Sequence, residues 1–214
     1  MAVAVLMITA CKRRPEQDKN VIDKPNIEIK DGKLSPEALW SFGRIGEVSV
    51  SPDGKKVLYT LTYYSISENK GNAEIYTMNI DGSDVQRLTT TVSSEWNVIW
   101  NPKGDKIGFI YADENGVNIY EMNPDGTGRT AISDLKEGDL EGFSYSPDGT
   151  KVVYVRAVPK QDKYAKLKEG LDKTTGRIND DLAYRHWDNW VDAIPQPFVA
   201  DFDGKKIGEG KNIL

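Results

Sequence analysis

The sequence predicts an all-β fold, a partial β-propeller of about three four-stranded blades with a mostly helical insertion in the third blade. Nearly the same hairpin pattern occurs three times, and a second turn follows each copy. The prolines of the three hairpins, Pro52, Pro102 and Pro147, lie 50 and 45 residues apart. This period is within the range of four-stranded propeller blades and does not suggest a helical solenoid.

The first hairpin of each predicted blade covers residues 48–59, 98–111 and 143–154. In each copy, alternating apolar residues lead into Pro-Asp-Gly or Pro-Lys-Gly, and the alternation resumes after a lysine. Proline presets φ and glycine accepts a positive φ, so the strand turns back at this point. Each copy therefore predicts two antiparallel strands.

The second hairpin of each blade turns at Asp81-Gly82, Asp125-Gly126 and Asp203-Gly204. The first two turns are 44 residues apart, whereas the third follows after 78. The third blade therefore carries an insertion, which we place at residues 158–196. Asp201 and Asp203 also resemble the start of a calcium loop, but Lys205 stands where a third oxygen ligand belongs, so we favour a plain turn.

The first part of the insertion, Lys160 to Lys173, predicts a charged helix. Tyr164, Leu167 and Leu171 form one narrow apolar stripe on it, and Gly176 follows its end. A helix with many lysines and one apolar stripe is typical of a solvated surface, and we favour that interpretation over a functional one.

The second part of the insertion is aromatic, and two interpretations stay open. Aromatic residues beside arginine are typical of contact sites, so this part could meet another domain or edge a substrate passage. It could also simply pack against its own blade. His186 is the only histidine, and a structural role for it is favoured over catalysis or metal binding. The candidate contact residues are Tyr184, Arg185, His186, Trp187 and Trp190.

The composition is that of a globular protein, with 38% hydrophobic and 29% charged residues among 214. The net charge is −5, and acidic and basic residues are interspersed. A nucleic-acid-binding surface needs a basic patch, so nucleic acid is excluded as a partner.

The amino terminus predicts a lipid anchor. Ala2 to Ala10 form an apolar run that is too short to span a bilayer, and Cys11 follows it as in a bacterial lipobox. No Lys or Arg precedes the run, which departs from the usual signal-peptide pattern. We assign residues 1–10 to a lipoprotein signal peptide, Cys11 to lipidation and residues 11–33 to a flexible tether. The predicted location is the bacterial cell envelope, with the membrane as a partner through the anchor.

Residues 34–44, followed by the first hairpin at 48–59, resemble the opening of peptidases in the prolyl oligopeptidase (S9) family. The first of these segments predicts the short helix that leads into their propeller, with Ser35 as its cap, Pro36 at the first helical position and Glu37 in the first turn. The resemblance covers residues 34–214. The turn units alone are also similar to WD40-like repeats and to the TolB-like (PD40) propellers of binding proteins.

The resemblance implies that the propeller selects short peptides for an α/β-hydrolase domain that carries a Ser, Asp and His triad. A nucleophile elbow requires Gly-x-Ser-x-Gly, which does not occur in these 214 residues. We therefore expect no catalytic residue, cofactor or metal site here. The pair of adjacent glutamates with which some relatives hold the amino terminus of a peptide is also missing.

Three blades are too few to close a propeller, since known rings have 4 to 8. The sequence therefore predicts one open apolar face and a fragment of a longer serine peptidase, whose substrate would be bound through a hydrolase domain that this chain lacks. Two alternatives stay open: a non-catalytic TolB-like lipoprotein that binds an envelope partner, and a remnant without function.

Overall fold

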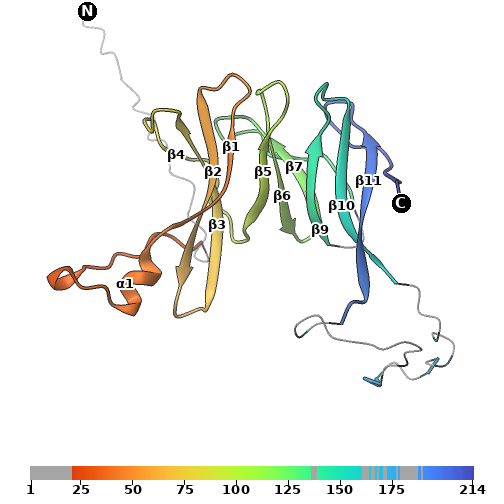
Figure 1. Ribbon diagram of the computed structural model, residues 1–214, viewed down its shortest axis with the longest axis horizontal. Coiled ribbons are helices and arrows are strands. Elements are labelled where there is room, and N and C mark those ends of the chain that lie inside the picture. Colours follow the sequence, from red (N-terminus) through yellow and green to blue (C-terminus); the bar gives the residue numbers. More distant parts are fainter. Residues whose placement is uncertain are drawn as a thin grey trace, which may run out of the picture.

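The structure is a computed structural model that describes residues 21–135, 139–160, 164, 167, 169–170, 173–176, 178, 188 and 190–214. Within them it contains three four-stranded antiparallel sheets, here called sheets 1, 2 and 3, which follow one another along the chain. Figure 1 shows the sheets side by side in an arc. The prediction of an all-β, propeller-like fold is confirmed.

The strands of each sheet pair in chain order. Sheet 1 contains β1 (Arg44–Val50), β2 (Lys56–Ser65), β3 (Lys70–Asn79) and β4 (Gln86–Arg87). Sheet 2 contains β5 (Glu95–Trp100), β6 (Ile107–Asp113), β7 (Gly116–Met122) and β8 (Thr130–Ala131). Sheet 3 contains β9 (Leu140–Tyr145), β10 (Lys151–Pro159), β11 (Ala193–Asp201) and β12 (Lys211–Asn212).

The turns of the first hairpins have the geometry that the repeated motif predicts. Gly54, Gly104 and Gly149 adopt φ values of 72°, 73° and 70°, which are easy only for glycine. The amide of each glycine donates to the carbonyl three residues earlier, at 2.8 to 3.0 Å. The same motif occurs three times and therefore reverses the strand in the same way in all three sheets.

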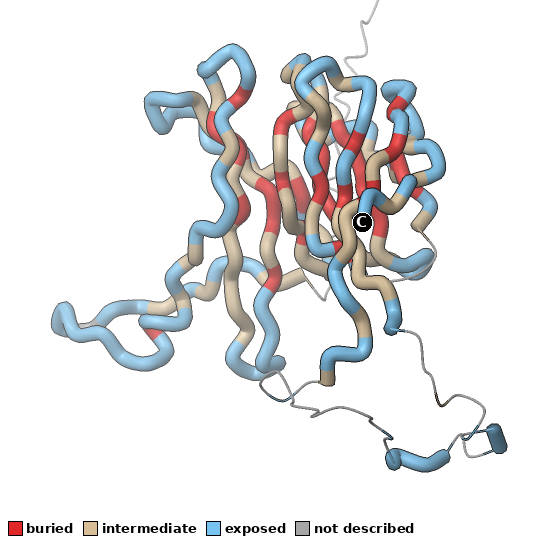
Figure 2. Tube along the Cα trace, turned by 45° about the vertical axis from the view of Figure 1, so that its right-hand side comes forward, coloured by how far each residue is buried: buried red, intermediate tan, exposed pale blue. Residues whose placement is uncertain are grey.

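The core lies between the sheets, where successive sheets pack face to face. Leu58 and Ile75 of sheet 1 pack against Phe109 of sheet 2, and all three are fully buried. Ile110 and Ile119 on the opposite face of sheet 2 pack in the same way against sheet 3. Figure 2 shows these buried positions as red bands along the central strands. A sheet in this arc is therefore stabilised by packing against its neighbours in addition to its own hydrogen bonds.

The predicted leader helix is confirmed. The helix α1 runs from Pro36 to Ser41, and the Ser35 hydroxyl caps it by accepting from the amide of Ala38 at 3.1 Å. The short helix η1 (Lys30–Gly32) precedes it. Among the described residues, no helix is long and apolar enough to cross a membrane.

The insertion in sheet 3 is narrower than the sequence predicts. β10 and β11 pair in register as far as Pro159 and Ala193, so the connection between them is residues 160–192. Residues 193–196, which we had assigned to the insertion, belong to β11, because Pro195 interrupts the apolar pattern without breaking the pairing. The predicted helix over Lys160 to Lys173 falls largely outside the described residues, and its helical character is not confirmed.

Candidate interaction surface

One end of the arc carries the segments that depart from the repeat. The leader helix α1 enters sheet 1 there, beside the turn between β2 and β3, and the connection 160–192 leaves sheet 3 from the same end. The turns with Gly54, Gly104 and Gly149, between the first two strands of each sheet, lie at the opposite end, as Figure 1 shows. Additions to a rigid repeat are where binding functions are usually found, so we call this the leader end and treat it as the candidate surface.

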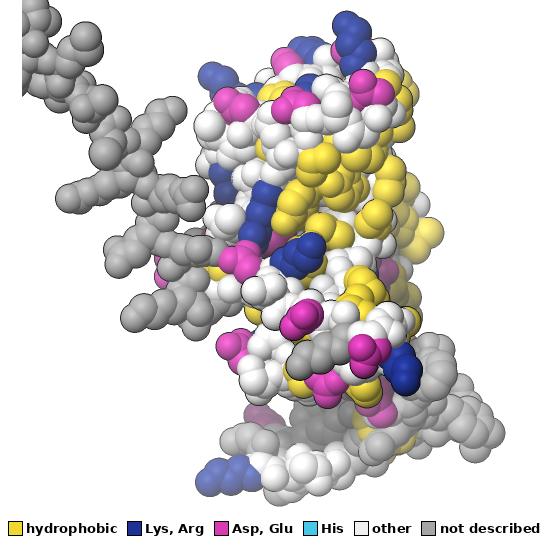
Figure 3. Space-filling model, turned by 90° about the vertical axis from the view of Figure 1, so that its left-hand side faces the viewer, with side chains coloured by type: hydrophobic (Ala, Val, Ile, Leu, Met, Phe, Trp, Pro, Cys, Tyr) yellow, Lys and Arg dark blue, Asp and Glu magenta, His cyan; other side chains and the backbone are white. Residues whose placement is uncertain are grey.

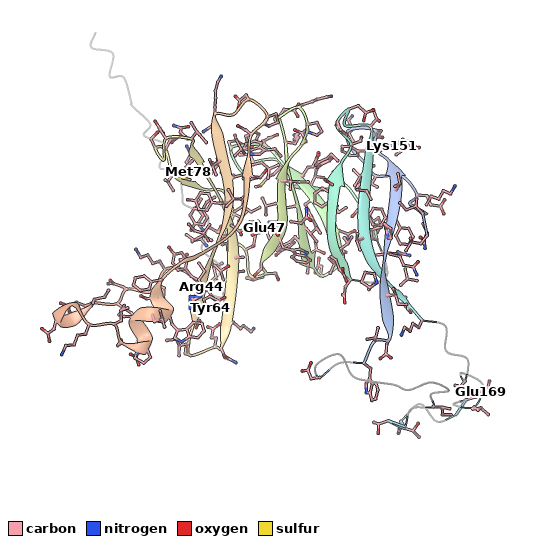
Figure 4. All side chains as sticks on the ribbon, in the orientation of Figure 1. Arg44, Glu47, Tyr64, Met78, Lys151 and Glu169 are labelled. Atoms are coloured by element: carbon pink, nitrogen blue, oxygen red, sulfur yellow. The ribbon has the colours of Figure 1, made fainter. Side chains whose placement is uncertain are left out.

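An aromatic cluster holds α1 against sheet 1. Trp40 meets Tyr64 edge to face, with ring centroids 5.2 Å apart. The Arg44 guanidinium lies over both rings, 4.9 Å from Trp40 and 5.1 Å from Tyr64. Figure 4 shows Arg44 and Tyr64 together at the base of β2. Cation–π contacts of this kind add to the packing and fix the direction in which the helix leaves the sheet.

A cavity of about 400 Å³ lies beside this cluster, lined by residues 21–27 of the leader segment, by α1 and by the β2–β3 turn. Several large apolar side chains near it stay exposed. Leu34, Leu39, Trp40, Phe42 and Ile66 are 43 to 64% exposed. A group of exposed apolar side chains on one end of a protein is typical of an interaction surface.

Side chains from the first strands tie neighbouring sheets together. The Glu47 carboxylate in β1 accepts from the amides of Asn97 and Val98 in β5, at 2.9 and 2.7 Å. Figure 4 shows Glu47 on β1. Asn97 repeats the tie toward β9: its amide nitrogen donates to the carbonyl of Phe143 at 2.9 Å, and its oxygen accepts from the amide of Phe143 at 3.0 Å.

The two tying residues occupy the same place in the repeat, four positions before the residue that opens the turn. Both lie where the first strand bulges, and Asn97 adopts a left-handed φ of 51° that asparagine tolerates. In sheet 3 this position is Gly142, which has no side chain to reach a further sheet. The ties therefore run from sheet 1 to sheet 2 and from sheet 2 to sheet 3.

Two carboxylates are buried at the junction of sheets 1 and 2. Glu95 binds the Arg129 guanidinium at 3.1 Å and accepts from the hydroxyls of Thr89 and Thr91 at 3.0 and 2.8 Å. Glu74 accepts from the amide of Thr91 at 2.8 Å. Burial, together with the nearby charge of Glu74, raises the pKa of Glu95 to about 7, although its hydroxyl and arginine partners oppose the shift.

The Arg129 that partners Glu95 also packs on aromatic rings. Its guanidinium lies 3.9 Å from the centroid of Tyr111 and about 5 Å from those of Phe109 and Tyr120. Through Arg129, which precedes β8, the cluster joins β5, β6 and β7 to the connection between sheets 1 and 2. It holds the first junction in place, and nothing in its geometry suggests a reaction.

Most of the predicted site residues lie outside the described residues. These are Cys11, Tyr184, Arg185, His186 and Trp187. Trp190 is described: it is half-buried, and its carbonyl accepts from the amide of Asp192 at 3.1 Å. The structure therefore does not test whether the aromatic segment acts as a contact site.

The turn interpretation of the calcium-like motif agrees with the structure. The Asp203 carboxylate accepts from the amides of Lys205 and Lys206, at 2.8 and 2.7 Å, and so closes the turn. In the part of the chain that the structure describes, no group of three or more potential metal ligands is present.

No pattern used to predict the fold pointed to Glu47, Asn97 or Glu95 as important residues. The first two could have been found, because aligning the three turns places them at the same position of the repeat. Glu95 gives no such signal, since only the packing of sheet 1 against sheet 2 shows that it is buried.

Comparison with known proteins shows a match to a propeller family and similarity to named peptidases. The family model described as "TolB beta propeller domain" matches residues 31–186. Dipeptidyl-peptidase 5 of Porphyromonas gingivalis is 36% identical over 181 residues, which is 85% of this chain and 26% of that protein. Dipeptidyl-peptidase 5 of Porphyromonas endodontalis is 33% identical over the same lengths. The chain thus spans about a quarter of the curated relatives that it matches.

Among solved structures, the acylaminoacyl peptidase of Pyrococcus horikoshii superposes with a TM-score of 0.59 at 16% identity, covering 80% of this chain and 25% of that one. This likeness concerns the fold. The resemblance to the propeller portion of prolyl oligopeptidase-type peptidases, predicted from the sequence, is confirmed by two relatives that are named dipeptidyl-peptidases. Since the family model matches more than half of its length, the chain belongs to the TolB β-propeller domain family.

Proposed function

We propose that these residues form the propeller portion of a serine peptidase that cleaves short peptides. The observation that carries the proposal is the 36% identity to a dipeptidyl-peptidase over 85% of the chain. In this role the three sheets are successive blades, and the connection 160–192 contains the helical insertion and the aromatic contact segment. The blades restrict which peptides reach a catalytic α/β-hydrolase domain, and they carry no catalytic group themselves.

The leader end is the proposed contact surface for that catalytic domain. Its exposed apolar side chains on α1 and on the β2–β3 turn would be buried in such a contact. The remaining parts of the proposal are a lipid anchor at Cys11 and a place in the bacterial envelope, which rest on the apolar run that precedes this cysteine.

The second candidate is a TolB-like binding protein without catalysis. The family model supports it, because its description names the TolB propeller and no peptidase. The two candidates differ in whether a reactive serine accompanies the propeller in the native polypeptide.

The test is to capture the native polypeptide from its own cells with an antibody against residues 34–214, then measure its mass and its labelling by a fluorophosphonate, which reacts with activated serines. The peptidase proposal expects a mass several times that of 214 residues, one labelled serine and release of dipeptides from chromogenic dipeptide amides. A polypeptide of about 214 residues without labelling would refute it and leave the binding function.

A matched pair of variants tests the contact surface in the same native polypeptide. Leu39→Asp places a charge on the leader end, whereas Ile80→Asp places one at the opposite end. The two side chains are similarly exposed, Leu39 at 52% and Ile80 at 60%. We expect Leu39→Asp to reduce dipeptide release at least tenfold and Ile80→Asp to leave it unchanged. Equal effects of the two substitutions would contradict a contact at the leader end.

A further inference from the structure

Two kinds of dipeptide in this chain can change their own backbone without an enzyme. Asn-Gly occurs once, at residues 115–116, and Asp-Gly occurs six times. In both, the backbone nitrogen of glycine can attack the side-chain carbonyl carbon of the residue before it, because glycine has no side chain to hinder the approach. The Asp-Gly pairs are at residues 31–32, 53–54, 81–82, 125–126, 148–149 and 203–204.

The structure holds five of the six Asp-Gly pairs in closed turns. In each, one carboxylate oxygen of the aspartate accepts two or three hydrogen bonds within its own turn, at 2.6 to 3.1 Å. These bonds fix the side chain, so the carbon that would be attacked cannot turn toward the glycine nitrogen. The five aspartates are Asp53, Asp81, Asp125, Asp148 and Asp203.

The attacking nitrogen and the charge of the carboxylate are controlled in the same turns. The amide of Gly126 donates to the carbonyl of Asn123 at 2.9 Å, which occupies the nitrogen that would attack. The equivalent bond is present at Gly54, Gly82 and Gly149. The hydrogen bonds to the carboxylates also lower the pKa of all five aspartates, that of Asp148 to about 2. An ionised carboxylate resists attack by a nucleophile, so these turns should keep their backbone intact.

The turn that contains Asn115 and Gly116 is built differently. It connects β6 to β7, and Glu114, Asn115 and Gly116 are all exposed. The carboxylate that closes this turn is that of Asp113, which accepts from the amide of Asn115 at 2.8 Å. The acceptor therefore belongs to a neighbouring residue, whereas in the five closed turns it is the reacting side chain itself.

The attacking nitrogen of this turn is easier to release. Gly116 pairs with Asp113 as the last pair of the hairpin, and the end of a hairpin opens at a small cost in free energy. A Cβ atom on Gly116 would meet nothing within 4 Å, so there is space for a ring to form. The side-chain amide of Asn115 is uncharged, which makes its carbonyl carbon a better target than that of a carboxylate.

We propose that Asn115 is a site of spontaneous modification, where the chain loses ammonia and the residue becomes aspartate or isoaspartate. A base in the solvent takes the proton from the nitrogen of Gly116, and this nitrogen forms a bond to Cγ of Asn115. The bond from Cγ to Nδ2 breaks, and ammonia leaves with a proton from water. Water then adds to one of the two carbonyl carbons of the cyclic imide and reopens the ring. In total, one amide and one water molecule give one carboxylate and one ammonium ion.

The other asparagines lack this combination of features. Asn101 and Asn123 precede proline, whose nitrogen has no proton to lose. Each of the remaining asparagines precedes a residue with a side chain, which hinders the attack.

The sixth Asp-Gly pair, at Asp31 and Gly32, is not closed in the same way. Among the described residues, none donates a hydrogen bond to the Asp31 carboxylate. We expect this pair to react more slowly than Asn115, because a carboxylate is the poorer target, but faster than the five closed turns.

The modification changes the charge and the backbone at the leader end. The β6–β7 turn lies at the same end as the β2–β3 turn, because the two hairpins hold the same place in their sheets. A carboxylate at position 115 would stand beside Asp113 and Glu114. Figure 3 shows further acidic side chains toward this end, at the bottom of the view. Isoaspartate also lengthens the backbone by one carbon, which disturbs the last pair of the hairpin. This inference goes beyond the proposed function and does not depend on it.

The experiment incubates the native polypeptide, captured with the antibody against residues 34–214, at neutral and at alkaline pH. Mass spectrometry then follows the tryptic peptide from Ile107 to Arg129, which contains both Asn115-Gly116 and Asp125-Gly126. We expect deamidation at Asn115 at least ten times faster than at any other asparagine, and faster still at alkaline pH. Isoaspartate, detected by methyl transfer from an isoaspartate methyltransferase, should form at position 115 and not at Asp125.

Two variants at exposed positions are the controls. Asn115→Gln keeps the amide group but lengthens the side chain, so the ring no longer closes readily and the signal should disappear. Thr127→Ala removes the hydroxyl that donates to Asp125, and should raise isoaspartate formation there without changing the rate at Asn115.

The proposal is overturned if Asn115 stays intact in the polypeptide while the same tryptic peptide, once released, deamidates. Deamidation that begins at another asparagine would also overturn it. So would isoaspartate that forms at Asp125 as fast as at Asp31, because the closed turns would then give no protection. None of these measurements uses peptidase activity, so they give the same answer whether or not the proposed function is correct.

Discussion

At the scale of single residues, Glu95 makes the stability of the chain depend on pH. Its pKa rises from an ordinary 4.5 to about 7 in the folded chain, chiefly through burial. Folding therefore favours the protonated carboxyl group. The stabilisation is complete below pH 4.5 and is lost as the pH rises through 7, a difference on the order of 3 kcal/mol.

We expect Glu95→Gln to reduce this pH dependence, because an amide cannot ionise. The measurement is the urea midpoint of unfolding at intervals from pH 4.5 to 8, monitored by tryptophan fluorescence. The midpoint of the unmodified chain should fall over this range, and that of the variant should fall less. Glu141→Gln, an exposed position in β9, serves as the control and should keep the full slope. Identical slopes for all three chains would show that Glu95 does not hold the proton.

Two glycines with nearly the same backbone conformation differ in their surroundings. Gly82 and Gly126 adopt φ values of 84° and 82° in equivalent turns. A Cβ atom on Gly82 would meet open space, whereas one on Gly126 would lie 2.7 Å from the carbonyl oxygen of Leu88 in the neighbouring sheet. In both Gly→Ala variants the left-handed backbone lowers the free energy of unfolding by about 1 kcal/mol. The free energy of the Gly126 variant falls further, because the junction between the sheets must shift.

The free energies of unfolding of the two variants, measured side by side, give the test. Since the strain of the turn is common to both, their difference reports only the contact with Leu88. Equal destabilisation would mean that the turn of sheet 2 does not press on sheet 1.

At the scale of strands and sheets, the ties between first strands set how firmly the sheets are joined. Asn97 makes two hydrogen bonds to the backbone of Phe143, and Gly142 lies against its oxygen. Removing these two hydrogen bonds leaves the amide and the carbonyl of Phe143 without partners, which lowers the free energy of unfolding by about 1 to 3 kcal/mol. Asn97 also has a left-handed φ of 51°, which alanine adopts at a further cost.

Two substitutions separate these costs. Asn97→Gly removes the hydrogen bonds without adding strain, and Asn97→Ala removes them and adds it. We expect both to destabilise the chain, alanine more than glycine, and hydrogen exchange to accelerate first at Phe143, where the tie ends. A glycine variant as stable as the unmodified chain would show that the tie contributes nothing.

How well an element could be predicted depended on whether local residues determine it. The turns and the leader helix follow from Pro, Gly and Ser35 in the chain itself, and the structure has them as predicted. The end of β10 and the start of β11 were misplaced, because Pro195 breaks an apolar alternation that strand pairing across the sheet tolerates. The buried partnership of Glu95 with Arg129 joins residues 34 apart, and no local pattern reveals it.

At the scale of the whole molecule, the two ends of the strands in the arc carry different segments. The leader helix and the strand ends that border the connection 160–192 lie at one end of the arc, and the turns with Gly54, Gly104 and Gly149 lie at the other. Along the chain, sheets 1 and 2 each pack one face against the sheet that follows. The repeated turns predicted this order from the sequence, but not which side chains would face the neighbouring sheet. That property depends on which side of each strand faces outward, and the pairing register determines it.

The direction of the ties has a consequence for how the protein is made. Glu47 precedes the strand that it holds by 50 residues, and Asn97 precedes Phe143 by 46. As the chain leaves the ribosome, each sheet that has already folded therefore offers both a hydrogen-bonding side chain and an apolar surface to the sheet that emerges next. Synthesis can then proceed sheet by sheet, with each new sheet packing on the last one and covering the apolar surface that was open until then.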